Sequence, residues 1–386
     1  MNATALAVAG TAPSIMIAAG EASGDLHGAT LCRALREAAP AAQIFGMGSA
    51  RMAAAGVDVL EDVTPHAAVG GTEAAGGVLA LYRTYRRLRA RLDGPGRPHA
   101  LVLVDFPEFN LRLARAARRR GVPVVYFVPP QIWAWRPWRV RAMRRVLSLV
   151  VAVFPFEPPL YRTAGVPVVY VGHPVVDLLA AAPARGAVRA RLDLGASVPV
   201  LALLPGSRRA EIERVLPTMR DAIARVRASR PGVRVLVARA PGVDAALIAR
   251  HVPGALITDG AYDAIRAADV ALATSGTVTL EAALLGTPTV ACYRVSRASA
   301  VMIRSLTRVP WMSLANIVLG REVIPELFQE ALTSERLACE AERLLDDGHA
   351  RAAQQVAFRE LAEALGAPGV GSRAAQAVLA VARESS

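Results

Sequence analysis

Short runs that are apolar at every position recur along this chain, and they constrain its fold more than any other feature of the sequence. Ala100–Val104 reads ALVLV, and Val200–Leu204 reads VLALL. Such strands are typical of parallel sheets covered on both faces, because neither side of the strand suits water. Helix-like segments separate the runs. This alternation predicts repeated βαβ units.

The runs form two successive sets, and the alternation breaks between them near Gly172-His173-Pro174. The predicted strands are Ser14–Ala18, Gln43–Gly46, Ala100–Val104, Val122–Val128, Leu149–Phe154 and Val168–Val171, then Val200–Leu204, Val233–Ala238, Ala255–Thr258, Val270–Ala273 and Thr289–Tyr293. An Ala-, Arg- and Pro-rich stretch to about Arg191 is expected to link two domains. We therefore predict an α/β protein with two Rossmann-like, doubly wound domains facing across a cleft, residues 1–175 and 176–350, and a helical tail at 351–386.

The bulk composition is that of a globular protein. The chain has 386 residues, 53% of them hydrophobic and 20% charged, which suffices for two domains with separate cores. Its three cysteines lack any CxxC spacing, which argues against a disulfide scaffold or a structural zinc site. No basic residue precedes the mild apolar segment at the N-terminus, and the apolar stretch 146–156 is too short to cross a bilayer. We expect a cytoplasmic protein.

The formal net charge is +13, and every basic residue other than histidine is an arginine. A GC-rich genome alone produces an arginine- and alanine-rich composition. A strongly basic surface also attracts phosphates, on a nucleotide, a nucleic acid or an anionic membrane. Since no basic recognition helix or RNP-like motif occurs, we do not expect a nucleic-acid partner.

The stretch Ala271–Pro288 reads ALATSGTVTLEAALLGTP and predicts a strand, a small polar turn and a helix. Unpaired N–H groups and the helix dipole at such a turn favour an anion, here beside Ser275, Gly276 and Thr277. Glu281, one turn into the helix, could reach sugar hydroxyls beside a bound diphosphate. Alternatively, Ser275 or Thr277 only caps the helix and Glu281 only complements its dipole.

A second turn of this kind, Pro205-Gly206-Ser207-Arg208, follows the strand Val200–Leu204. An arginine at a helix N-terminus can clamp a diphosphate without a metal ion. No acidic pair that could hold a divalent cation lies near it in the sequence, so neither a metal nor another cofactor is expected.

Two loops of the first half also follow predicted strands. Gly20-Glu21-Ala22-Ser23-Gly24-Asp25 opens a helix, and its glycines suggest close approach of the backbone to a ligand, with a turn capped by Ser23 or Asp25 as the alternative. Asp105, in Val104–Asn110, ends an apolar strand inside a loop of aromatic residues and proline. Partial desolvation would suit this carboxylate for general-base catalysis, with helix capping as the alternative.

Tryptophans are concentrated in Pro129–Arg139, where Trp133, Trp135 and a third ring lie within six residues, beside arginines. Aromatic faces with interleaved arginines can stack on a sugar or base, although core packing would explain one ring. His27 and His173 are expected near loops at the cleft, although a lone histidine is more often structural. They are secondary candidates.

The segment Val78–Leu92 predicts an amphipathic helix, with Val78, Leu81, Tyr85, Leu88 and Leu92 at helical spacing and arginines on the other side. Such a helix can lie in an anionic membrane surface. Packing of the apolar stripe on the sheet is the equal alternative.

In combination, these motifs resemble the lipid-A-disaccharide synthase family. They are GEASGD, VDFPEFN, PPQIWAWR, VGHP, LPGSRRAE, TSGTVTLEAALLGTPTV and CYR, and the resemblance runs from about Ser14 to Glu330. The family consists of inverting GT-B glycosyltransferases, which transfer 2,3-diacylglucosamine from its UDP donor to 2,3-diacylglucosamine 1-phosphate. The products are the β-1,6-linked lipid A disaccharide 1-phosphate and UDP.

The resemblance implies roles for particular residues. Ser275, Gly276, Thr277 and Arg208 would hold the UDP diphosphate, Glu281 and Asn316 would lie at the nucleotide, and Arg294 of the CYR motif is a secondary candidate. Asp105 would deprotonate the acceptor 6-hydroxyl, while Arg208 would stabilise the departing UDP. The remaining expected substrate contacts are Glu21, Ser23, Gly24, Asp25, Trp133, Trp135, Gly206 and Ser207.

The resemblance also implies a peripheral location on the cytoplasmic face of the inner membrane, with the first domain facing acceptor and membrane. The tail would pack on the first domain of its own chain or of a homodimer partner. The segment Ala67–Val78 departs from relatives in being mostly Ala and Gly. Another UDP-sugar GT-B enzyme, including a 2-epimerase, and a basic nucleic-acid-binding protein are the alternatives.

Overall fold

The protein was analysed as a computed structural model that describes residues 12–63, 74–94, 96–135, 137–307 and 309–384. It divides into two compact units. Unit 1 combines residues 1–177 with residues 367–386, and unit 2 is the continuous segment 178–366. Each unit is described by itself.

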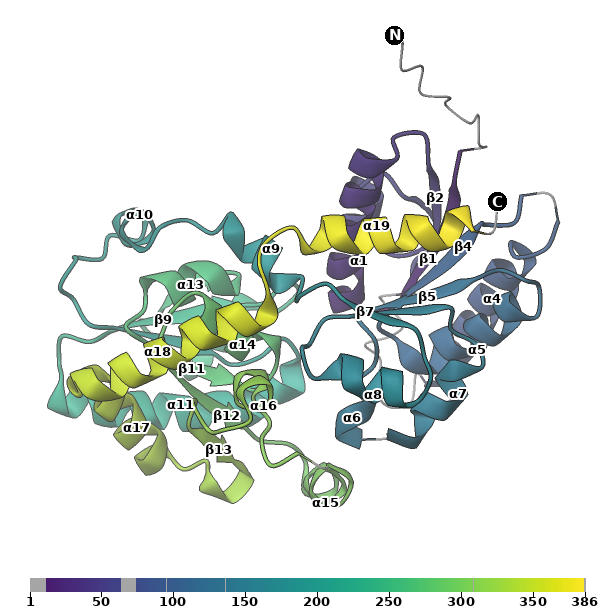
Figure 1. Ribbon diagram of the computed structural model, residues 1–386. Coiled ribbons are helices and arrows are strands. Elements are labelled where there is room, and N and C mark those ends of the chain that lie inside the picture. The colour runs from purple at the N-terminus through teal and green to yellow at the C-terminus, as the bar shows by residue number, and fades with distance from the viewer. Residues whose placement is uncertain (1–11, 64–73, 95, 136, 308, 385–386) are drawn as a thin grey trace, which may run out of the picture. The chain divides into compact units, whose positions relative to one another are not determined.

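Unit 1 contains a seven-stranded, fully parallel sheet (Figure 1). Its strands are β1 (Ser14–Ala19), β2 (Gln43–Met47), β3 (Asp58–Glu61), β4 (Ala100–Val104), β5 (Val124–Phe127), β6 (Leu149–Ala152) and β7 (Val168–Tyr170). The strand order is β3-β2-β1-β4-β5-β6-β7. The order reverses between β1 and β4, and ligands of doubly wound sheets bind at the carboxyl ends of the strands at such a point.

Helices cover both faces of this sheet. They are α1 (Ala22–Ala38), α2 (Ala50–Ala54), α4 (Ala74–Ala90), α5 (Pro107–Arg118), α6 (Ile132–Trp135), α7 (Val140–Arg144), α8 (Glu157–Thr163) and α19 (Val370–Arg383). The short helix α9 (Val175–Ala180) crosses the boundary between the units, which lies after residue 177. On one face, α4, α5, α7 and α8 bury their apolar side chains in a single core with the strands. On the other face α1 and α19 pack side by side, and α19, yellow in Figure 1, also contacts β4, β5 and β6.

Unit 2 repeats the design with six parallel strands in the order β10-β9-β8-β11-β12-β13. They are β8 (Val200–Leu204), β9 (Arg234–Arg239), β10 (Leu256–Asp259), β11 (Val270–Thr274), β12 (Thr289–Tyr293) and β13 (Glu326–Phe328). Here the order reverses between β8 and β11. Every residue of β8 and of β11 is buried, in agreement with their apolar sequences.

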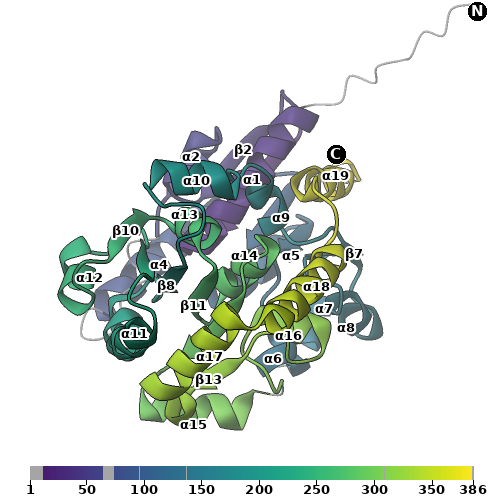
Figure 2. The same cartoon turned by 90° about the vertical axis from the view of Figure 1, so that its left-hand side faces the viewer.

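The helices of unit 2 are α10 (Arg185–Arg191), α11 (Arg209–Ser229), α12 (Ala245–His251), α13 (Ala261–Ala267), α14 (Thr277–Leu284), α15 (Arg297–Leu306), α16 (Leu314–Leu319), α17 (Ser334–Asp346) and α18 (Gly348–Leu365). The main core lies between the strands and α11, α12 and α17. In Figure 2, α17 is followed by α18, which contacts α14 and α16.

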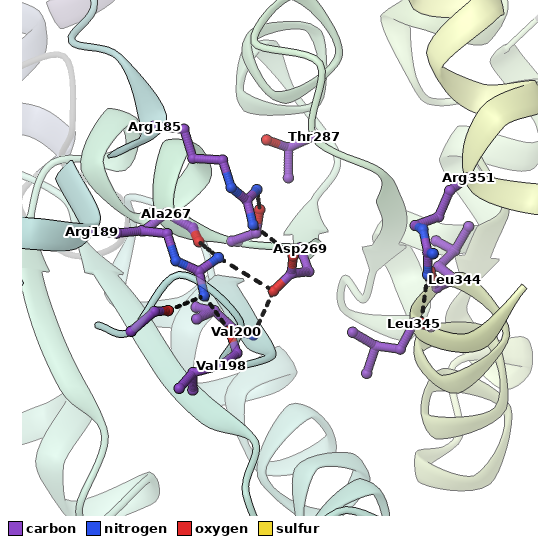
Figure 3. A network of polar contacts seen from close by, with 12 residues as sticks. Arg185, Arg189, Val198, Val200, Ala267, Asp269, Thr287, Leu344, Leu345 and Arg351 are labelled. Atoms are coloured by element: carbon purple, nitrogen blue, oxygen red, sulfur yellow. Dashed lines mark hydrogen bonds and ion pairs between the residues drawn. The ribbon is translucent and has the colours of Figure 1, made fainter. Parts of the chain in front are cut away.

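The stretch expected to be a linker is largely helical, because it contains α9 and α10. Figure 3 shows why α10 is fixed to unit 2. The carboxylate of Asp269 accepts hydrogen bonds from Arg185 (2.6 Å) and from the backbone N–H of Val200 (2.8 Å). Arg189, which is buried, lies 3.6 Å from the same carboxylate and donates to the carbonyl of Ala267. Residues 178–191 therefore belong to unit 2.

The predicted tail, residues 351–386, is divided between the units. α18 belongs to unit 2, and only residues from 367 onward return to unit 1. The return is fixed by Asp177, whose carboxylate accepts from the backbone N–H groups of Gly369 (2.7 Å) and Gly371 (2.8 Å) at the start of α19. Arg373 donates from the same helix to the carbonyl of Val171 (2.9 Å).

Candidate functional site

The two glycine-containing turns predicted to bind a diphosphate meet in one cavity of about 330 Å³ in unit 2. They follow β8 and β11, so the cavity lies at the point where the strand order of the sheet reverses. Seven predicted site residues line it: Gly206, Ser207, Arg208, Ser275, Gly276, Thr277 and Glu281. Residues after β9 and β10, among them Pro241 and Gly260, complete the wall. The sequence pattern did not single these out.

The turn before α11 is shaped by Glu211. Its carboxylate faces the backbone N–H groups of Ser207 and Arg208 at 3.4 and 3.3 Å and the Arg208 guanidinium at 3.2 Å. Gly206 has a φ of 108°, and a Cβ there would lie 2.8 Å from Oε2 of Glu211. The turn thus requires glycine, while the Arg208 side chain stays 74% exposed in the cavity wall. Glu211 was not among the predicted site residues, although its spacing from Arg208 matches a helix capping box.

Four residues from the end of β11 to the start of α14 line the cavity: Thr274, Ser275, Gly276 and Thr277. Gly276 has a φ of 156°, which side chains rarely adopt. Ser275 donates its hydroxyl to the carbonyl of Met312 (2.9 Å) and its N–H to that of Cys292 (3.1 Å). Ser275 therefore lines the cavity with both donors already paired. The buried hydroxyl of Thr274, which also lines the cavity, has no hydrogen-bond partner in the structure.

Glu281 lies in the cavity wall one turn into α14. Burial raises the pKa of its carboxyl from 4.5 to about 7. A carboxyl held in this range is characteristic of functional sites. It can accept hydrogen bonds from ligand hydroxyls when ionised.

Two residues expected at or near the nucleotide do not line this cavity. Asn316 is fully buried, and its amide holds together the segment before β13: it donates to Ile324 and Glu326 and accepts from Val323 and Ile324, all at 2.8–2.9 Å. Arg294 donates to Thr218 (3.0 Å) and to the carbonyl of Leu332. Both side chains are therefore engaged within unit 2, and a contact of Asn316 with the nucleotide stays a prediction.

In unit 1, Asp105 directly follows β4 at the reversal point of the sheet. Asp105 and Phe106 both adopt left-handed backbone conformations, with φ of 51° and 46°. Consecutive non-glycine residues in this region are strained and are found mainly at functional sites. The carbonyl of Asp105 accepts hydrogen bonds from Tyr126 (2.7 Å) and Asn110 (2.6 Å), which fix the strained turn. Burial raises the pKa of the Asp105 carboxyl above its ordinary value.

The loop after β1 supports Asp105. Ser23 donates its hydroxyl to the Asp105 carboxylate (3.2 Å). Gly20 is in contact with the ring of Phe106, and a Cβ at this glycine would lie 2.2 Å from Cδ1 of the ring. The close approach expected at the loop is therefore made at Gly20 by an aromatic side chain of the same unit. Gly24 lies nearby, since a Cβ added there would lie 3.7 Å from the Cβ of Asp105.

Asp25, another of the expected substrate contacts, lies beside the start of α2. This side chain is buried and accepts hydrogen bonds from the backbone N–H groups of Ser49 (2.7 Å), Arg51 (3.1 Å) and Met52 (3.2 Å). It thus caps α2, a helix other than its own. Glu21 precedes α1 at the end of β1 and is half-buried.

The aromatic loop forms part of a ring cluster. Trp133 contacts Phe156 edge to face, with centroids 4.9 Å apart, and Phe154 stacks on Phe156. The ring centroid of Phe154 lies 5.0 Å from that of His173, and the His173 centroid lies 6.1 Å from that of His27. Burial lowers the pKa of His27 to about 4 and that of His173 to about 3, so both are neutral at pH 7. Trp135 lies in α6, and its side chain is outside the described part of the structure.

Within the residues that the structure describes, no group of three or more His, Cys, Asp or Glu side chains could hold a metal ion. In that same part of the chain, no helix combines the length and the apolar character needed to cross a membrane.

Comparison with known proteins identifies the family. The model of the lipid-A-disaccharide synthetase family matches residues 15–381. The chain belongs to this family. A lipid-A-disaccharide synthase from Myxococcus xanthus is 41% identical over 372 residues, which cover 95% of this chain and 97% of the relative. This family member is accordingly a glycosyltransferase.

Solved structures show the same fold at low sequence identity. The UDP complex of MnaA from S. aureus has a TM-score of 0.63 and 13% identity, over 95% of each chain. The glycotransferase of kitacinnamycin has a TM-score of 0.63 and 15% identity, over 96% of this chain and 99% of the other. The predicted GT-B architecture of two Rossmann-like units is therefore confirmed.

Proposed function

We propose that this glycosyltransferase moves 2,3-diacylglucosamine from UDP to the 6-hydroxyl of 2,3-diacylglucosamine 1-phosphate. The products are a β-1,6-linked disaccharide 1-phosphate and UDP. The observation that carries the proposal is the unit 2 cavity, where Arg208, the start of α14 and Glu281 line one wall. Membership of the family supplies the substrate class.

The cavity suits a nucleoside diphosphate leaving group. Negative charge builds on the diphosphate as the bond to the anomeric carbon breaks, and the Arg208 guanidinium and the dipole of α14 stabilise that charge. The hydroxyl and the N–H of Ser275 are bonded to the carbonyls of Met312 and Cys292, so its proposed role is to shape the turn that begins α14. The half-buried carboxylate of Glu281 accepts a hydrogen bond from the ribose.

Asp105 is the proposed general base. It removes the proton from the acceptor 6-hydroxyl as the oxygen attacks the anomeric carbon, and direct displacement inverts that carbon. The raised pKa of its carboxyl brings its basicity closer to the operating pH. The strained turn, held by Tyr126 and Asn110, fixes the position of this carboxyl.

Helix α4 is the proposed contact with an anionic membrane surface. Leu88 and Leu92 are buried in the unit 1 core, so the C-terminal half of the predicted stripe packs on the sheet. At the other end of α4, Val78, Leu79 and Tyr82 are 66%, 50% and 57% exposed. Exposed arginines on the same helix, at 83, 86 and 89, would approach anionic lipid headgroups. The Ala67–Val78 departure falls largely outside the described residues.

The function is tested by measuring UDP release with each lipid substrate alone and with both together. We expect UDP release only when both lipid substrates are present. Asp105→Asn is expected to lower kcat by about 10²–10⁴-fold, the usual contribution of a general base, whereas Asp93→Asn, an exposed unit 1 aspartate paired with Arg120, changes little. An unchanged kcat in Asp105→Asn would show that Asp105 is not the general base.

The diphosphate clamp is tested separately by Arg208→Ala. We expect about 10- to 100-fold weaker UDP binding from the loss of a charge-assisted hydrogen bond. Arg209→Ala is the matched control, since this neighbouring arginine pairs with Glu213 instead (2.7 Å). Turnover of UDP-N-acetylglucosamine without any lipid acceptor would instead indicate an epimerase.

A further inference from the structure

A second hollow, of about 370 Å³, lies beside the diphosphate cavity in unit 2. Six of the nine residues that line it are apolar, and Thr307, Glu322 and Glu326 supply polar groups; the apolar six are Ile303, Val309, Pro310, Trp311, Met312 and Phe328. Phe328 ends β13, so the hollow lies at the same edge of the sheet as the diphosphate cavity. The motifs of the sequence did not point to it.

The two spaces share a wall. Ser275 lines the diphosphate cavity, and its hydroxyl is bonded to the carbonyl of Met312, which lines the hollow. A narrow crevice, lined by Ser275, Tyr293, Met312 and Phe328, runs between them along the ends of β11, β12 and β13. A ligand whose diphosphate lies at α14 therefore has an apolar space within reach of the group attached to that diphosphate.

The wall of the hollow is preformed. Glu326 accepts hydrogen bonds from the backbone N–H groups of Met312 and Ser313, both 2.8 Å, and from the Asn316 amide (2.8 Å). Three donors on one carboxylate hold the chain before α16 against β13. The buried Asn316 therefore helps to hold this wall in place through its hydrogen bond to Glu326.

We propose that this hollow binds an acyl chain of the donor sugar. The inference rests on the proposed function, because only a diacylated donor carries such a chain beside its diphosphate. The hollow has the size of a small-molecule site, and burial of methylene groups against its six apolar side chains removes them from water. The wall that it shares with the diphosphate cavity, through Ser275 and Met312, makes the donor chain the proposed occupant.

The test fills the hollow. Ile303→Trp, on α15, places a larger side chain in its wall, and Val356→Trp is the control, since that exposed residue of α18 does not line the hollow. Donors with long acyl chains and donors shortened by four methylenes are compared at a fixed acceptor and fixed detergent. A buried methylene is worth about 0.8 kcal/mol, or about fourfold in binding.

In the unmodified protein and in Val356→Trp, shortening is expected to lower kcat/KM by at least tenfold. In Ile303→Trp the long-chain donor loses that advantage, so the two donors differ by less than threefold, while UDP binds with unchanged affinity. Equal chain-length dependence in all three proteins overturns the inference. Absence of transfer by the unmodified protein would instead refute the proposed function.

A direct readout is Trp311, the tryptophan that lines the hollow; the other three lie at 133, 135 and 138 in unit 1. A donor with bromine atoms on its acyl chain is expected to quench tryptophan fluorescence, and Trp311→Phe removes most of the quenched signal. Quenching that is unaffected by Trp311→Phe would place the chain elsewhere.

Discussion

The surroundings of Glu281 destabilise the charged form of its carboxyl group. Its pKa is raised to about 7 by burial alone, with no partner offsetting the cost. An unfolded chain releases this proton near pH 4.5, so the folded state holds it more tightly between pH 4.5 and 7. Folding stability at this site therefore falls as the pH rises through that window and stays low above it.

Glu281→Gln is expected to stabilise unit 2 at pH 8, by up to about 3 kcal/mol, and to change little at pH 4.5. The same variant should bind UDP about tenfold more weakly at pH 8, because a ribose hydroxyl loses a charged acceptor. Denaturant unfolding followed by Trp311 fluorescence, together with UDP titration, checks both. A Glu281→Gln variant that is less stable at pH 8 and binds UDP normally would contradict both the stability and the binding prediction.

Several residue roles were beyond prediction from the sequence. Ser23, Asp25 and Gly24 fall in one motif, yet Asp25 caps α2 and Ser23 donates to Asp105, 82 positions away. Asn316 stands in a stretch that resembles a nucleotide contact, and its amide N–H groups donate hydrogen bonds to Ile324 and Glu326. Motif spacing identifies a polar residue near a strand end. The partner of its side chain depends on packing between distant segments.

At the scale of elements, α19 has a structural task that its sequence hardly indicates. It presents small residues to α1: a Cβ added at Gly371 would make van der Waals contact with Thr30 at 3.4 Å and Ala34 at 3.5 Å. The same helix buries Val378 and Leu379. It therefore completes the unit 1 core from the far end of the chain.

Leu379→Ala is expected to destabilise unit 1 by about 2–5 kcal/mol, the usual cost of deleting a buried leucine side chain. Gln376→Ala, at an exposed position of α19, is the control and should stay within about 0.5 kcal/mol of the unmodified protein. The tryptophans at 133, 135 and 138 report unit 1 unfolding. Equal stability of the two variants would show that α19 is dispensable for the core.

The strands were largely predictable because buried parallel strands are apolar throughout. All eleven predicted strands exist, with ends within about two residues of those predicted. The two that were not predicted, β3 (DVLE) and β13 (ELF), are short edge strands containing charged residues, and they lack that signal. The predicted linker contains the boundary between the units, after residue 177, but helix α10 within it was not predicted, since α10 is fixed by the ion pairs of Asp269 rather than by an apolar stripe.

For the whole molecule, the net charge of +13 and the exposed end of α4 lead to a joint expectation. The protein should bind vesicles containing anionic lipid more tightly than zwitterionic ones, and binding should weaken as salt is added. Replacing Val78 and Leu79 by glutamate should weaken binding at least tenfold, since each loses up to about 1.5–3 kcal/mol of apolar burial.

Val356→Glu, which changes an exposed apolar residue of α18 instead, is the control for vesicle binding. Sedimentation with vesicles at two salt concentrations gives the measurement. If the α4 variant and the control sediment alike, α4 is not the membrane contact.

The return of residues 367–386 to unit 1 has a consequence for biosynthesis. A ribosome adds about 5–20 residues per second and releases the N-terminal part first. Unit 2 is continuous in sequence and has all its strands once residue 366 has emerged. The face of β4, β5 and β6 that α19 covers must wait for the last residues of the chain. Unit 1 is thus the first unit to be synthesised and the last to be completed. Until α19 has been made, this sheet face of unit 1 is the apolar surface that a chaperone would have to cover.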